Sequence, residues 1–153
     1  MSNGESPEIP SDRHQKAAPE SPELPLSKPL TLAVALPICV AGLVVPGLGH
    51  VLLKRWVRGV VLAGCVLLMF FFGLGMSGKL YTPSEIEQPL QIFAFFADVG
   101  VGLPYWYSEQ SGLGIGEMTE RTFDYGTTFL WVAGLLNYLI VLDAFDIARG
   151  RKP

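Results

Sequence analysis

The sequence predicts an all-α membrane protein: a helical hairpin, one broken or interfacial helix and one C-terminal transmembrane helix, preceded by a disordered tail. Hydrophobic residues make up 50% of the 153 residues, and charged residues only 16%. Most charges lie outside four long apolar segments, and roughly 20 apolar residues in a helix are enough to cross a bilayer core. The first two segments are joined by VVPGLGHVLLKRWVRG at 44–59, where proline, glycine and basic residues are typical of a turn between two helices.

Residues 1–28 are predicted to be a disordered tail. Residues 1–29 hold six of the twelve prolines and five acidic residues, with almost no large apolar side chains. Such a segment cannot bury enough surface to offset the entropy of ordering. A helical membrane domain is predicted at 29–148, followed by a short basic tail at 149–153.

Four segments make up this membrane domain: 30–53, 57–77, 83–107 and 126–147. The first has no charged residue before His50, and the second is apolar as far as a glycine-rich end. The PGLG sequence is predicted to end the first helix and to turn the chain at the membrane surface. The basic residues that follow would then meet lipid phosphates.

Segment 83–107 allows two interpretations. Asp98 lies near its centre, where a charged carboxylate costs about 2.5–3.5 kcal/mol on insertion scales, and two glycines and a proline follow. The TPSE sequence predicts a capping box with Thr82 as the N-cap. The segment either spans the membrane as a broken helix, which we favour, or lies in the interface as an amphipathic helix.

The basic residues leave the orientation open. With four spans and an internal N-terminus, the tails and the 79–88 loop hold seven of the 11 Lys and Arg residues. With segment 83–107 not crossing and the N-terminus outside, the dense clusters at 54–58 and 149–152 both become cytoplasmic. Dense clusters near the ends of spans influence orientation most strongly.

Several classes of function are disfavoured. The net charge of −3 gives no basic stripe for nucleic acid. Cys39 and Cys65 lie in apolar segments without metal-ligand spacing. His50 is the one imidazole in the predicted folded part, so no nucleophile–base pair stands out. We therefore predict no enzyme activity and no catalytic, cofactor or metal site.

Asp98, Asn137 and Asp143 are the other polar candidates within the apolar segments. Asn137 follows Gly134 by about one helical turn, which predicts a close helix contact with an interhelical hydrogen bond. Asp98 precedes a glycine-rich break and is a candidate for lining a polar cavity. His50 is either part of a structural connector or a proton carrier.

The sequence resembles the two-transmembrane-helix domain family, especially a bacterial branch of small multi-span proteins with a Pro-Gly-x-Gly-His turn. The matching residues are Pro46, Gly47, Gly49, His50, Gly59 and Asp143. The resemblance covers the first, second and fourth segments. Leu52-Leu53 replace the family's aromatic pair, and 78–122 looks like an insertion. The resemblance implies a membrane architecture in a bacterial cytoplasmic membrane, without an activity.

We therefore expect an integral membrane protein that serves as a structural or interaction subunit. Its expected partners are the lipid bilayer and either further copies of itself or another membrane protein. The alternative is a small transporter or proton-coupled carrier that uses intramembrane carboxylates.

Overall fold

The computed structural model describes residues 30–151. The tail predicted at 1–28 and the last two residues of the basic tail lie outside the described residues. Helices make up 70% of the described part of the chain, which contains no strand. The all-α class predicted from the sequence is therefore confirmed.

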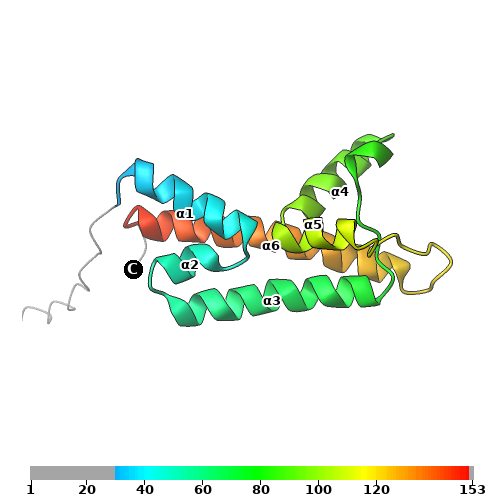
Figure 1. Cartoon of the computed structure of the whole chain (residues 1–153), viewed down its shortest axis with the longest axis horizontal. Coiled ribbons are helices and arrows are strands. Elements are labelled where there is room, and N and C mark those ends of the chain that lie inside the picture. The colour runs from blue at the N-terminus through cyan, green and yellow to red at the C-terminus, as the bar shows by residue number, and fades with distance from the viewer. Residues whose placement is uncertain (1–29, 152–153) are drawn as a thin grey trace, which may run out of the picture.

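Two long antiparallel helices, α3 (Trp56–Gly75) and α6 (Phe123–Ala148), form the body of the molecule (Figure 1). At 1.5 Å per residue they are about 30 and 39 Å long. Both are long and apolar enough to cross a membrane, judged by length and composition. They also make the most extensive contact between any two helices in the described residues.

Two pairs of shorter helices cover opposite halves of α6. The first pair is α1 (Leu32–Val44) with α2 (Leu48–Leu52), and the second is α4 (Pro89–Val99) with α5 (Leu103–Gln110). The α1–α2 pair starts beside the C-terminal end of α6, runs to its middle and turns back, whereas the α4–α5 pair does the same from the other end (Figure 1). The chain therefore repeats one order twice: a half-length helix, a break, a short helix and a long helix.

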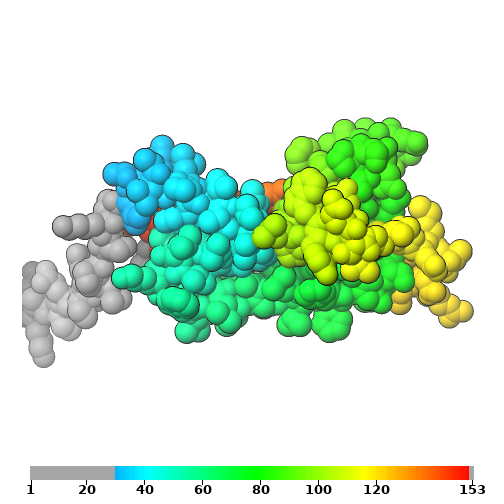
Figure 2. Space-filling view, viewed as in Figure 1, coloured from blue at the N-terminus to red at the C-terminus, as the bar shows by residue number. Residues whose placement is uncertain are grey.

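Neither half-length helix reaches the far end of α6, because α1 is about 20 Å long and α4 about 16 Å long. The start of α1 is fixed by a hydrogen bond in which the Leu30 N–H donates to the Ala148 carbonyl at 2.9 Å. Both α1 and α4 pack against α6, and α2 lies between α1 and α3. In the space-filling view α1 and α4 form two bulges, and α6 is visible between them (Figure 2).

A single apolar core lies where α3, α5 and the middle of α6 meet. Tyr105 and Phe70 are its largest fully buried side chains. Its other buried members are Val66, Leu80, Val101, Leu130, Ala133 and Ile140.

One local expectation is confirmed and one is wrong. The PGLG sequence ends the first helix, since α1 stops at Val44, and Pro46 lines a pocket with Leu67, near the middle of α3. The predicted depth of this turn at a membrane surface stays a prediction. The TPSE sequence forms only a 3-10 turn, Pro83–Glu85, and α4 starts later at Pro89. The carboxylate of Glu85 pairs instead with the Lys79 ammonium at 3.3 Å, because the chain before the turn folds back toward it.

Candidate functional site

Both half-length pairs break at the same sequence pattern, Gly-x-x-x-Pro. The patterns are GLVVP, from Gly42 to Pro46, and GVGLP, from Gly100 to Pro104. In an α-helix each carbonyl accepts a hydrogen bond from the N–H four residues later, and proline has no N–H. The carbonyls of Gly42 and Gly100 therefore lose their ordinary helical donors.

The side chain of Asn137, near the middle of α6, replaces both donors. Its Nδ2 atom lies 2.8 Å from the Gly100 carbonyl oxygen and 3.4 Å from that of Gly42. The Leu43 carbonyl oxygen is a third acceptor at 3.3 Å. Asn137 is fully buried, and its Oδ1 atom has no hydrogen-bond partner in the described structure. One amide thus joins the ends of two broken helices.

Glycines let the three backbones meet at this point. A Cβ at Gly134, one turn before Asn137, would overlap the carbonyl oxygen of Ala97 in α4. Gly102 has φ +82, and a Cβ there would overlap the Leu43 carbonyl oxygen at the end of α1. The two breaks are therefore in direct backbone contact as well as sharing Asn137.

Asp98, at the end of α4, is fully buried and also binds backbone. Its Oδ2 atom accepts a hydrogen bond from the Tyr81 N–H at 2.9 Å, and the Tyr105 hydroxyl donates to the Tyr81 carbonyl at 3.0 Å. Both backbone groups of Tyr81 are thus held by side chains of the α4–α5 pair. The other carboxyl oxygen of Asp98, Oδ1, is buried and has no partner in the described residues.

A second polar pair lies nearer the C-terminal end of α6. His50 of α2 is fully buried, and its Nε2 atom lies 3.1 Å from Oδ2 of Asp143, whose side chain is 34% exposed. The His50 Nδ1 atom is buried and has no hydrogen-bond partner among residues 30–151. This contact joins the short helix α2 to α6 across 93 residues of sequence.

The predicted glycines lie around α2 and make it compact. A Cβ at Gly49 would lie 3.2 Å from the Ala144 side chain of α6. A Cβ at Gly59 would lie 2.7 Å from the Val51 side chain, and one at Gly47 would overlap the Gly59 carbonyl oxygen. These glycines let α2 pack closely between α3 and α6.

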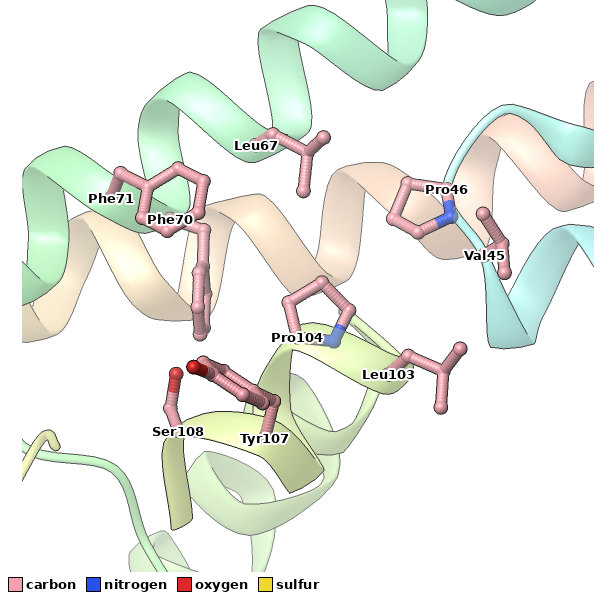
Figure 3. A pocket seen from close by; sticks show the side chains of 9 residues that line it. All are labelled: Val45, Pro46, Leu67, Phe70, Phe71, Leu103, Pro104, Tyr107 and Ser108. Carbon is pink, nitrogen blue, oxygen red and sulfur yellow. The ribbon is translucent and has the colours of Figure 1, made fainter. Parts of the chain in front are cut away.

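An apolar pocket of about 360 Å³ lies between the two breaks and α3. Pro46 and Pro104, which end the two Gly-x-x-x-Pro patterns, both line it, together with Leu67 (Figure 3). Tyr107 and Ser108 contribute the hydroxyl groups of this lining (Figure 3). The remaining lining is apolar, so the pocket offers no polar path along the molecule.

The structure gathers the eight candidate residues into two groups. Three of them lie at the two breaks: Pro46 ends the first, Asp98 precedes the second, and Asn137 binds carbonyls of both. The other group lies in and around α2 and consists of Gly47, Gly49, His50, Gly59 and Asp143. The sequence analysis did not recognise that Gly42 and Gly100 occupy equivalent positions in the two breaks, and that Pro104 is the equivalent of Pro46. The signal for them is the recurrence of Gly-x-x-x-Pro at the ends of two apolar segments.

Within residues 30–151 no group of three His, Cys, Asp or Glu side chains gathers as a metal site would require. No curated protein and no solved structure gives a significant match to the chain. The resemblance to the two-transmembrane-helix domain family stays a prediction. A family model matches residues 37–153, which include both breaks and both polar pairs. The chain belongs to that family, DUF6677, a family of unknown function.

Proposed function

We propose that the protein is an integral membrane protein in which α3 and α6 cross the bilayer and each half-length pair enters from one side and returns. We further propose that it acts as a structural or interaction subunit. We propose a bacterial cytoplasmic membrane as its location, which the resemblance to bacterial multi-span proteins supports.

The observation that carries the membrane placement is the exposure of apolar side chains along α3. Only 22% of the most apolar 18-residue window of α3 is buried, and 33% of that in α6. A core helix of a water-soluble protein would be mostly buried. Large apolar residues on α3 are more than half exposed from its first turn to its last: Val57, Val60, Val61, Leu68, Phe71 and Phe72. Lipid is the solvent that suits such a surface.

The polar groups inside the molecule support a structural role. Broken helices are tolerated at membrane depth when protein groups satisfy the freed backbone. The side chain of Asn137 binds freed carbonyls at both breaks, and the side chain of Asp98 binds the backbone N–H of Tyr81. Because these side chains bind their own fold, the described residues favour a scaffold over a conduit.

The charges at the two ends of the molecule indicate its orientation. The end that contains the α2–α3 turn and the C-terminus of α6 carries five basic residues, Lys54, Arg55, Arg58, Arg149 and Arg151. The opposite end carries two basic residues and six acidic ones, Glu85, Glu87, Glu109, Glu117, Glu120 and Asp124. Basic residues near the ends of spans favour the cytoplasm. We therefore place the α2–α3 turn and both ends of the described chain there.

Labelling of single cysteines tests this placement, in a background with Cys39 and Cys65 replaced by serine. A membrane-impermeant maleimide should label Lys54→Cys from the cytoplasmic side and Ser111→Cys from the opposite side. Val45→Cys, beside the first break, should stay unlabelled from both sides in intact membranes. Labelling of Val45→Cys from water would place the turn at the surface, and a chain that stays monodisperse without detergent would refute the membrane placement.

The subunit role can be tested with the natural Cys65, which is exposed on α3. In native membranes with Cys39 replaced by serine, iodine, which enters the bilayer and oxidises thiols, should trap a discrete disulfide-linked species, either a dimer of the chain or one defined hetero-complex. A purely monomeric product at all iodine concentrations would contradict an interaction surface on this face of α3.

A proton-coupled carrier is the second candidate. It is favoured by two buried titratable side chains, Asp98 and His50, each of which has one polar atom without a hydrogen-bond partner in the part of the chain that the structure describes. Proteoliposomes loaded with a pH-sensitive dye would then show a proton flux that Asp98→Asn abolishes. If wild-type proteoliposomes are as tight as protein-free vesicles, an uncoupled proton path through the protein is excluded.

A further inference from the structure

Lys54, just after α2, has an unusual backbone conformation. It has φ +61, and in the described chain only one other residue besides glycine, Ser77, has a positive φ. The Lys54 N–H donates to the Val51 carbonyl and the Arg55 N–H donates to the His50 carbonyl, both at 2.9 Å. This is the hydrogen-bond pattern of a Schellman motif, in which glycine is the usual residue at the left-handed position. Lysine costs stability there, a cost that a separate role for its side chain would explain.

An apolar groove of about 280 Å³ lies beside this turn. Lys54 and Arg55 are its only charged lining residues. Three helices contribute Ile38, Leu52 and Ile147 to its apolar lining, and Leu30 and Leu53, just outside helices, complete it. Lys54 is exposed and Arg55 is half-buried. The groove therefore combines two cationic side chains with an apolar wall.

These cations are not neutralised within the described part of the molecule. No carboxylate there forms an ion pair with Lys54, Arg55 or Arg58. The two carboxylates at this end of α6 are engaged elsewhere, Asp143 with His50 at 3.1 Å and Asp146 with Arg151 at 3.6 Å. An anionic ligand would complement the charge of the groove.

We propose that this groove binds one anionic phospholipid, with its phosphate at Lys54 and Arg55 and an acyl chain along Ile38 and Leu52. The left-handed turn brings Lys54 and Arg55, which are consecutive in the sequence, to the same groove. Arg58 lies three residues after Arg55, on the same side of α3. Clusters of basic residues at the cytoplasmic surface attract anionic lipid headgroups. The site rests on the membrane placement proposed above, which puts this turn at the cytoplasmic leaflet.

Thermal unfolding of the full chain in a non-ionic detergent tests the site. Phosphatidylglycerol and phosphatidylcholine with identical acyl chains are titrated separately, and inorganic phosphate is a third ligand. We expect phosphatidylglycerol to raise the unfolding temperature in a saturable manner, with little change from the other two. Equal shifts from both lipids would overturn the proposal, and an equal shift from phosphate would assign the groove to a free anion.

The test variant combines Lys54→Gly with Arg55→Gln, which removes both charges and suits the left-handed turn. Its apparent affinity for phosphatidylglycerol should fall about 10- to 30-fold. The matched control, Lys79→Gln with Arg121→Gln, removes two charges from the opposite end and should bind like the wild type. A phosphatidylglycerol shift that survives the first pair, or is lost equally with the control pair, would refute the site.

Lys54→Gly alone separates the lipid site from the fold. Without lipid this variant should unfold at or above the wild-type temperature, because glycine relieves the left-handed backbone. A lower temperature would show that the lysine stabilises the turn itself and would overturn the argument from its conformation. If the chain needs detergent but shows no lipid selectivity, only the lipid site is refuted. If the chain needs no detergent, the membrane placement itself is refuted.

Discussion

Replacing Asn137 with leucine removes the one side chain that serves both helix breaks and keeps a similar volume. The change deletes bonds to the carbonyls of Gly42, Leu43 and Gly100 at 3.4, 3.3 and 2.8 Å. The first and last of these have no helical donor, because prolines stand four residues later. Interhelical hydrogen bonds in membrane proteins average about 0.6 kcal/mol, whereas a buried acceptor left without a donor costs about 1–3 kcal/mol. We therefore expect Asn137→Leu to lower the free energy of unfolding by about 2–4 kcal/mol.

Unfolding in mixed detergent micelles, followed by far-ultraviolet circular dichroism, measures this loss. Tyr138→Phe is the matched control, because its hydroxyl also bonds across to α4, donating to the Phe96 carbonyl at 2.9 Å in an exposed position. The control should lose no more than about 1 kcal/mol. If Asn137→Leu unfolds within about 0.5 kcal/mol of the wild type, the breaks do not depend on the amide.

Substitutions at three further positions can be measured by the same unfolding assay. Asp98→Leu should cost about 1–3 kcal/mol because it leaves the partly buried Tyr81 N–H without an acceptor. Asp98→Asn keeps an acceptor oxygen, and equal losses in the two variants would show that this bond contributes nothing. Gly134→Ala should cost about 1–3 kcal/mol or more, because the added methyl group displaces α4 at the Ala97 carbonyl, and a neutral result would mean that α4 is free to move. His50→Ala removes a fully buried ring and should cost about 2–5 kcal/mol; a loss below 1 kcal/mol would contradict close packing of α2.

The long helices could be predicted from the sequence because their apolar runs have few interruptions. The segment predicted at 57–77 corresponds to α3 at Trp56–Gly75, and the one at 126–147 corresponds to α6 at Phe123–Ala148. The extra first turn of α6 holds Asp124, a charge that a search for apolar segments excludes. Hydropathy therefore finds such helices and misplaces only their ends.

The depth of the first turn could not be predicted in the same way. Hydropathy indicates that PGLG lies among apolar groups, but a turn at the end of a long helix and one at its middle have the same composition. Depth is set by partners far away in the sequence, since Asn137 is 95 residues from Gly42. The contact between His50 and Asp143 depends on the same long-range packing, which no local pattern reports.

The dependence of both breaks on α6 has a consequence for how the protein is made. The ribosome synthesises α1 to α5 before Asn137, so under the membrane placement proposed above neither break has its amide donor when it enters lipid. We therefore expect each early segment to be shielded by the insertion machinery, or to remain an unbroken helix, until α6 has been synthesised. A nascent chain that stops short of this helix should therefore leave no stable half-product and should be cleared by quality-control proteolysis.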